Sequence, residues 1–442
     1  MSHEPQRSVA ATRSAPKRTA PTRTVAAIAA ASALLVAMSA CSTPGAVNDP
    51  AEAAPGVTDD TVTIGTHQPL TGPAAAGYSS ISAATTAYFA YVNENGGVNG
   101  REIEYLVKDD GYNPATTQTV VRELVQDDEV FAILNGLGTP THTSVLDYLN
   151  QNEVPDLFVA SGSTSWNQPE KYPWTFGFNA DYVTEAEALA QYADDEFAGK
   201  SVCVLGQDDD FGDEFIEGLE NVLGEGSLAS VQRYSVSNQD VVAQIGAMQA
   251  AGCEVNMLAT VNGFTALAIG TAAKLGYRAQ WMSSSSGGDA VTLAGFLGDA
   301  APMLLEGFVT TNYLPYAPGN EWDDLFRQIN DEYNDGAPFD GNTVFGMSVG
   351  YLFAEALAKA GDEPTRQGIV DAIQSGDLVG NGLVPLSFSG DSHAAYKGVS
   401  ITTVVDGVQD FIGVTYVSDG SGGVESFDGE AVALENDGLP TS

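Results

Sequence analysis

Residues 155–166, PDLFVASGSTSW, point to the fold class, because an apolar run there ends abruptly in small polar side chains. The run LFVA, residues 157–160, has the length and character of a strand buried on both faces of a sheet. Serine, glycine and threonine fill residues 161–165, and Trp166 follows. The pattern recurs in QWMSSSSGGD, residues 280–289, where an apolar pair precedes four serines. The chain is therefore expected to end two buried strands in clusters of hydroxyl groups.

Strand-like and helix-like segments alternate on both sides of this stretch. A first series has strands at 62–66, 102–110, 130–136 and 155–160, with helices at 79–97, 141–152 and one that Asn113 caps before Pro114. A second series has helices at 181–196, 211–223 and 264–275 and strands at 201–206, 229–235 and 255–260. Helices at 319–334 and 343–360, a strand-rich stretch and a loose tail complete the chain. The alternation predicts an α/β fold with two series of βαβ units on parallel sheets.

Both hydroxyl clusters follow predicted strands, where parallel sheets bind ligands. Free backbone N–H groups and the positive end of a helix dipole favour an anion there, and serine and threonine add donors. A single serine at such a place is often only a helix N-cap. Two clusters in different series, each beside a tryptophan, favour a ligand site.

Residues 1–40 have the pattern of a secretory signal peptide. Basic side chains precede the apolar run at 25–38, whose 14 residues are too few for a stable membrane span. The sequence MSAC ends at Cys41 and resembles a bacterial lipobox, in which the cysteine is lipidated and becomes the mature N-terminus. Ordinary cleavage near Ala40 is the alternative. Residues 41–59 are rich in proline, alanine and glycine, and we expect a flexible tether.

Acidic residues outnumber basic ones by 58 to 17, which gives a formal net charge of −41. Such a surface repels nucleic acid and anionic lipid headgroups, and its self-repulsion favours a soluble monomer.

About 400 residues follow the signal peptide, too many for one hydrophobic core and suited to two domains. A disulfide between Cys203 and Cys253 is permitted in an exported protein, but their offset along neighbouring strands favours two buried thiols.

Several ordered segments of the chain resemble the type I periplasmic binding proteins, in the Leu/Ile/Val-binding group of transporter receptors. The segment NENGGVNGREIEYLVKDDGYNP, residues 93–114, is the most specific. The other similar segments, in order, are PLTGPAAAGY, VPDLFVASGSTSW, VLGQDDDFGDEF, KLGYRAQWMSSSS and GYLFAEALAKAG. The resemblance covers residues 60–416.

This resemblance implies two Rossmann-like lobes joined by a three-strand hinge, with a ligand cleft between them. Lobe I would comprise residues 60–177 and 311–398, lobe II residues 178–310 and 399–420, and residues 421–442 a C-terminal tail. The implied crossovers lie near 176–180, 307–313 and 397–402. A ligand held in the cleft would pass to a permease driven by an ATPase. With lipidated Cys41, the protein would be extracytoplasmic and anchored to the outer face of the cell membrane.

The family's ligand-binding roles transfer to particular positions of this chain. In the first lobe the resemblance assigns ligand-carboxylate contacts to Gly138 and Thr139 after the third strand and to Gly162, Ser163 and Thr164 after the fourth. The remaining implied site residues are Tyr78, Phe211, either Val261 or Asn262, and Ser285. Amino-acid receptors place a carboxylate near position 285 to pair with the ligand ammonium. This chain has serine there, which leaves the ligand's identity open.

The residues favour a binding protein over an enzyme. The three histidines after the signal peptide are widely spaced, and no nucleophile with a base is recognisable, so neither catalysis nor a cofactor is expected. The segment QDDDFGDE fails the spacing of an EF-hand, and its aspartates are expected to cap a helix near Phe211. His142 is expected on a helix surface, with a ligand contact as the alternative. A ligand-sensing receptor of the same fold is the other function left open.

The neutral serines and apolar Phe211 give an ammonium group no charged partner, whereas Asp289 and Asp209 are expected to cap helices. We therefore expect a small carboxylate with an apolar or aromatic body, ahead of a free branched-chain amino acid.

Overall fold

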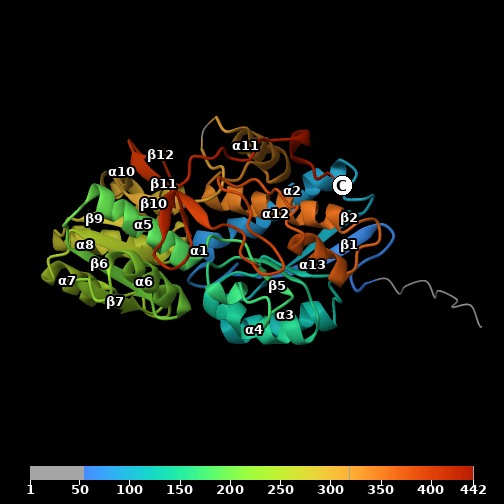
Figure 1. Ribbon diagram of the computed structural model, residues 1–442, viewed down its shortest axis with the longest axis horizontal. Coiled ribbons are helices and arrows are strands. Elements are labelled where there is room, and N and C mark those ends of the chain that lie inside the picture. Colours follow the sequence, from blue (N-terminus) through green and yellow to red (C-terminus); the bar gives the residue numbers. More distant parts are fainter. Residues whose placement is uncertain (1–53, 318, 442) are drawn as a thin grey trace, which may run out of the picture. The chain divides into compact units, whose positions relative to one another are not determined.

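The computed structural model describes residues 54–317 and 319–441, which contain two sheets with their own helices. The predicted signal peptide, Cys41 and most of the tether lie outside the described residues. We call the sheet of the first five strands, with its helices, lobe I, and the other sheet with its helices lobe II (Figure 1). In the described part of the chain, every helix is too short or too polar to span a membrane.

Lobe I contains a parallel sheet in the order β2-β1-β3-β4-β5. Its strands are β1 (Thr61–Gln68), β2 (Glu102–Asp109), β3 (Ile133–Leu134), β4 (Asp156–Val159) and β5 (Thr175–Gly177). All four residues of β4 are buried, as expected for a central strand covered on both faces.

The helices of lobe I cover both faces of this sheet. They are α1 (Ala75–Tyr78), α2 (Ser80–Glu94), α3 (Pro114–Gln126), α4 (Thr139–Gln151), α11 (Glu321–Tyr333), α12 (Gly341–Lys359) and α13 (Arg366–Gln374), with the single turn η1 (Thr164–Trp166). Asn113 caps α3 as predicted, since its side chain accepts from the Ala115 amide. Helices α2 and α12 lie side by side in Figure 1. Gly346 permits this approach, because a Cβ there would lie 2.3 Å from the Ile81 carbonyl oxygen.

Lobe II contains an eight-stranded mixed sheet in the order β13-β12-β11-β10-β9-β8-β6-β7. Its parallel strands are β6 (Val202–Gln207), β7 (Ser230–Tyr234), β8 (Val255–Ala259), β9 (Gln280–Ser283) and β10 (Val309–Asn312), and its antiparallel strands are β11 (Gly398–Val405), β12 (Val408–Ser418) and β13 (Val424–Ser426). Its helices are α5 (Tyr182–Glu196), α6 (Asp210–Leu223), α7 (Val242–Ala250), α8 (Asn262–Leu275), α9 (Ala290–Leu297) and α10 (Ala301–Leu304), with the turns η2 (Ser285–Gly287) and η3 (Gly298–Ala300).

The chain passes between the lobes three times before β13: between β5 and α5, between β10 and α11, and between α13 and β11. Each lobe is therefore built from separate stretches of sequence. The predicted fold class, with two α/β lobes joined by crossovers, is confirmed.

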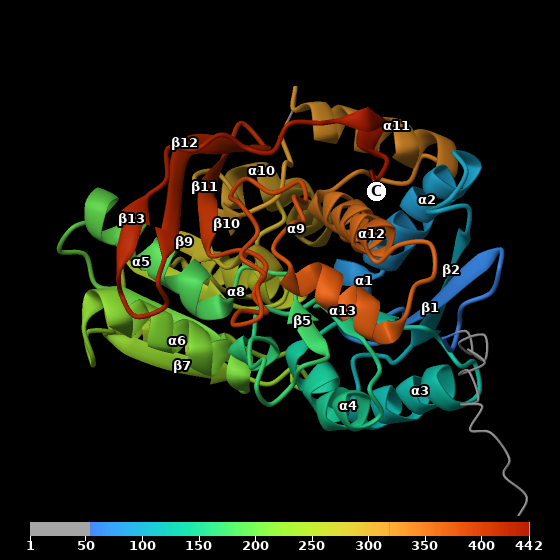
Figure 2. The same cartoon turned by 45° about the vertical axis from the view of Figure 1, so that its right-hand side comes forward.

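The last twenty residues do not form the loose tail that the sequence suggested. Strand β13 pairs with β12 in lobe II, and the chain then continues to lobe I, where η4 (Asn436–Gly438) lies beside α11 (Figure 2). There the Trp322 indole N–H donates to the Val432 carbonyl (3.0 Å), and the Tyr88 hydroxyl donates to the Gly438 carbonyl (2.6 Å). The sequence does not reveal these bonds, because they use backbone carbonyls that any residue supplies.

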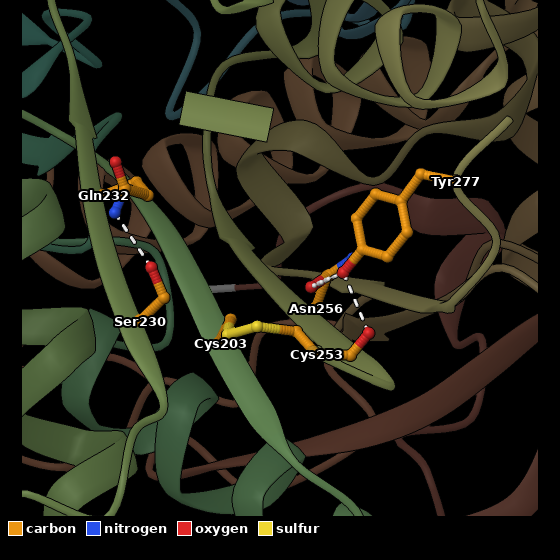
Figure 3. The surroundings of a disulfide bond; sticks show 6 residues. All are labelled: Cys203, Ser230, Gln232, Cys253, Asn256 and Tyr277. Carbon is orange, nitrogen blue, oxygen red and sulfur yellow. Dashed lines mark hydrogen bonds between the residues drawn. A yellow bond between two sulfur atoms is a disulfide. The ribbon is translucent and has the colours of Figure 1, made fainter. Parts of the chain in front are cut away.

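Cys203 and Cys253 form a disulfide, with Cα atoms 5.8 Å apart, so the expectation of two thiols is wrong (Figure 3). Cys203 lies in β6 opposite Asn256 of β8, as the sequence offset implied. Cys253, however, lies before β8 begins, and the chain at that point returns toward β6. The Tyr277 hydroxyl lies 2.9 Å from the Cys253 carbonyl oxygen and 3.0 Å from Asn256 Oδ1, which fixes this turn.

Candidate functional site

A cavity of about 100 Å³ lies where strand ends of both lobes meet. From lobe I, Gly138 follows β3 and Ala160 follows β4. From lobe II, Phe211 opens the helix after β6, and Ser285 follows β9. The carboxyl ends of parallel strands are where this kind of fold binds ligands. The cavity is therefore the candidate binding site.

Aromatic rings are prominent in its wall. The rings that line it are those of Tyr78, Tyr112, Tyr182, Phe211, Tyr313, Tyr316 and Phe345. Tyr182 and Phe211 are stacked, with ring centroids 4.1 Å apart. Burial raises the pKa of Tyr182 to about 12, so its phenol is neutral at physiological pH. Such walls suit a ligand with an apolar or aromatic body.

Tyr78 connects the two lobes across the cavity. It ends α1 in lobe I, and its hydroxyl donates to the Ser286 carbonyl of lobe II (2.5 Å) and accepts from the Asn262 amide (3.2 Å). Gly77 is part of the same contact, because a Cβ there would lie 3.2 Å from Asn262 Cβ. The structure therefore has the lobes closed on one another at this point.

The first hydroxyl cluster holds a carboxylate of the protein itself. Glu214, on α6 of lobe II, accepts from Ser163 Oγ (2.9 Å), the Thr164 amide (2.9 Å) and Thr164 Oγ1 (2.8 Å) of lobe I. Burial raises the pKa of Glu214 to about 7, although these donors oppose the shift. Two of the residues predicted to bind a ligand carboxylate, Ser163 and Thr164, thus donate to Glu214 instead.

The second cluster is similarly occupied, here within lobe II. Glu185, in the first turn of α5, accepts from the Ser285 amide (3.0 Å) and from the Ser285 hydroxyl. Burial raises the pKa of Glu185 to about 7. The sequence gives no sign of this pairing, because the two residues are separated by 100 positions.

Asp289 is the only charged residue among those that line the cavity. It caps α9 as predicted, accepting from the Thr292 amide (2.6 Å), and its other oxygen accepts from the Gly341 amide of lobe I (2.8 Å). Asp340, the N-cap of α12, lies nearby, and burial together with the Asp289 charge raises its pKa to about 6. Asp209 caps α6, also as predicted.

Behind the lobe I wall, two histidines and two aspartates form a buried chain of hydrogen bonds. Asp110 Oδ2 lies 2.8 Å from His67 Nδ1, His67 Nε2 lies 3.0 Å from His142 Nδ1, and His142 Nε2 lies 2.9 Å from Asp156 Oδ2. All four residues are buried, so the expectation of a surface His142 is wrong. The helix on which His142 lies was predicted correctly, but its first turn faces the core because it follows buried β3.

The predicted site residues fall into two groups. Those that line the cavity are Tyr78, Gly138, Phe211 and Ser285, along with the alternative Val261. Those that lie beside it in hydrogen-bonded or packed positions are Thr139, Gly162, Ser163, Thr164 and Asn262. Thr139 bonds to Ser161 and Tyr182, and a Cβ at Gly162 would lie 2.7 Å from the Tyr182 ring. Their predicted roles in ligand binding stay predictions.

Sequence reasoning missed most of the aromatic wall and both glutamates. The tryptophans beside the two clusters are not part of it: Trp166 packs against His142, and Trp281 packs against Tyr277. Tyr182 was within reach of prediction, since it begins the helix after the first crossover and therefore lies at the junction of the lobes. Asn179, in the same crossover, and Tyr313, which follows β10 at the second crossover, carry the same signal.

Comparison with known proteins gives consistent matches. A family model described as periplasmic binding protein matches residues 61–409. Leu/Ile/Val-binding protein homolog 2 of Brucella abortus (strain 2308) is 26% identical over 256 residues, which are 57% of this chain and 66%, just under two thirds, of that relative. Leu/Ile/Val-binding protein homolog 1 of Brucella suis biovar 1 (strain 1330) is 24% identical over 69% of this chain and 80% of its own length.

Solved structures share the fold. A fatty acid ABC transporter substrate-binding protein from Thermomonospora curvata has a TM-score of 0.73 and 22% identity, covering 87% of this chain and 96% of its own. A branched-chain amino acid ABC transporter protein from Thermus thermophilus with bound valine has a TM-score of 0.71 and 22% identity, covering 82% of this chain and 97% of its own. At these identities the likeness concerns the fold alone.

Proposed function

Because this chain belongs to the periplasmic binding protein family, we propose that it captures a small solute between its lobes and delivers it to the permease and ATPase of an ABC importer. It does so as a monomer outside the cytoplasm and without catalysing a reaction. The observation that carries the proposal is the cavity at the strand ends, closed by the contacts of Tyr78 with Asn262 and Ser286. Such a cavity opens and closes as the lobes rotate.

The aromatic wall supports a ligand with an apolar or aromatic body. Relatives and structural neighbours are named for leucine, isoleucine, valine and a fatty acid, all of which bear a carboxylate. The sequence also predicted a carboxylate-bearing solute. In this chain, however, two of the predicted contact residues, Ser163 and Thr164, are bound to Glu214.

A solute screen tests the proposal. Thermal unfolding is measured with amino acids, aromatic and branched acids, their amides and small peptides, because binding to the folded state raises the midpoint. Small-angle scattering with each hit should give a smaller radius of gyration than the free protein. If no solute raises the midpoint or reduces the radius, the receptor function is refuted. Loss of solute uptake on deletion of the gene distinguishes import from sensing.

We also propose that lipidated Cys41 anchors the protein to the outer face of the membrane, as the MSAC sequence suggests. Replacing Cys41 with serine should release the protein into the medium and abolish labelling by a fatty-acid probe, with Cys203→Ala as a control that keeps both the anchor and the label. Continued labelling of the Cys41→Ser variant would contradict this proposal.

A further inference from the structure

We propose that the ligand of this cavity carries no anionic group: it is an uncharged solute, of the primary-amide kind, with a branched apolar or aromatic body. This inference rests on the proposed receptor function and narrows its substrate class. It separates this chain from relatives named for carboxylate-bearing ligands.

The lobe I donors are already used when the lobes are closed. Ser163 and Thr164 direct two hydroxyls and one amide at a single carboxylate, that of Glu214. Glu214 lies one helical turn after Phe211, which lines the cavity, so both residues are on the same face of α6. A ligand carboxylate would meet these donors only by displacing Glu214 and opening the lobe contact.

The lobe II cluster offers an anion the neutral Ser286, which lines the cavity, but not Ser285. Ser285 lines the cavity, but its amide and hydroxyl both donate to Glu185, which is buried behind it. Any anion at Ser285 would therefore lie next to an acidic side chain and without these two donors. In both hydroxyl clusters that the sequence predicted for a ligand anion, an acidic side chain of the protein accepts hydrogen bonds instead.

The rest of the wall gives an anion no counter-ion among the described residues. None of the residues that line the cavity is lysine, arginine or histidine, and Asp289 is the only one that is charged. A carboxylate transferred from water to this wall loses hydration without gaining a counter-ion, which is strongly unfavourable. The protein's large negative charge adds repulsion at longer range.

A cation is disfavoured for a different reason. Both oxygens of Asp289 already accept backbone amides, at the starts of α9 and α12, so its charge is partly compensated. For an uncharged polar group, by contrast, Asn179 Oδ1 is available: it is a buried acceptor on the cavity wall with no partner among the described residues. An amide N–H of a ligand would satisfy it.

Matched series of solutes test the inference. The probes are isovaleramide, isovalerate and isopentylamine, and phenylacetamide, phenylacetate and phenethylamine, which keep the body and change the head from neutral to anionic to cationic. In calorimetry with the purified protein, we expect the amides to bind and the acids to bind about tenfold more weakly or worse. An acid or an amine that binds more tightly than its amide would overturn the inference while leaving the receptor function intact.

Variants on α6 test the part assigned to Glu214. The measured quantity is the ratio of the affinity for an amide to the affinity for the matching acid. Glu214→Ala removes the charge and frees the donors, and should reduce this ratio. Glu214→Gln removes only the charge and should reduce the ratio less. Glu217→Ala, at an exposed position of the same helix, should leave the ratio unchanged. An unchanged ratio in Glu214→Ala would overturn the role of Glu214. The inference also fails if the protein closes only on anionic solutes from outside these series. If the protein closes on no solute, the proposed function fails.

Discussion

The partly buried carboxylate of Glu214, in lobe II, joins the two lobes by accepting hydrogen bonds from lobe I. Burial raises its pKa from the usual 4.5 to about 7 in the closed structure. When the lobes separate, the side chain is expected to regain water and its usual pKa. The closed state therefore binds a proton more tightly than the open state does.

This difference predicts that closure depends on pH. Because the closed-state pKa is the higher one, the stabilisation of the closed state is complete below 4.5 and is lost as pH rises through 7. The ligand-free radius of gyration should then fall as pH is lowered across this window. In Glu214→Gln the dependence should shrink to the part due to other buried carboxylates, among them Asp340 and Glu185, whose pKa values are also raised. Glu217→Ala should behave as wild type. A radius independent of pH in the wild type would contradict this prediction.

The hydrogen bonds around His67 and His142 determine how many protons this group of side chains must hold. Three hydrogen bonds join Asp110, His67, His142 and Asp156, and each needs one proton. Two neutral imidazoles supply only two, so the chain holds a third proton on an imidazole or a carboxyl group. Burial, together with the neighbouring His142, lowers the pKa of His67, and Asp110 opposes that shift. The core of lobe I behind the cavity thus contains a buried, hydrogen-bonded polar network.

Replacing His142 with leucine should therefore destabilise the protein by about 3–5 kcal/mol, because it leaves Asp156 buried without one of its partners. Urea unfolding followed by circular dichroism measures the loss. The double variant His142→Leu, Asp156→Leu removes both partners and should lose less than the sum of the two single variants. Strict additivity would show that the two side chains are not coupled.

At the scale of elements, β6 and β8 are fastened by the disulfide between Cys203 and Cys253 (Figure 3). The bond closes a loop that contains α6, β7 and α7. Its effect on stability comes mainly from the unfolded chain, whose freedom it restricts.

For a sequence separation of 50 residues, removing this bond should lower the free energy of unfolding by about 4 kcal/mol. The variant Cys203→Ala, Cys253→Ala should unfold at lower urea concentration than the oxidised wild type. A reducing agent should lower the wild-type midpoint and leave that of the variant unchanged. A wild-type midpoint that does not respond to reduction would contradict the prediction.

Elements were predictable where the signal is local. The apolar run of β4, the Asn113 cap of α3 and the Asp209 cap of α6 are each fixed by residues a few positions apart. The partners that fill the site are not local: Ser163 and Glu214 are 51 positions apart, and His67 and His142 are 75 apart. Nothing in a single sequence marks such a pair, because only the sheet topology brings the two residues together. The resemblance located the loops of the site but not their partners.

At the scale of the molecule, a fourth connection joins the lobes in addition to the three crossovers. After β13 of lobe II, residues 427–441, which we call the C-terminal strap, run to lobe I and end beside α11 (Figure 2). The strap bonds to Trp322 through the Val432 carbonyl and to Tyr88 through the Gly438 carbonyl. Any rotation of the lobes must bend or stretch it.

The strap should therefore limit how far the lobes open. A variant ending at Ser426 lacks this connection but keeps β13 and the three crossovers, so its ligand-free radius of gyration should exceed that of the wild type. Its radius with saturating ligand should be nearly unchanged, because the closed contacts of Tyr78 and Glu214 remain. Affinity should fall by a factor of about ten or less, since a smaller share of the free protein is closed.

Trp322→Phe keeps a buried ring but loses the bond to Val432. It should increase the ligand-free radius of gyration by less than the truncation does. Equal ligand-free radii in the wild type and both variants would mean that the strap follows lobe motion without restricting it.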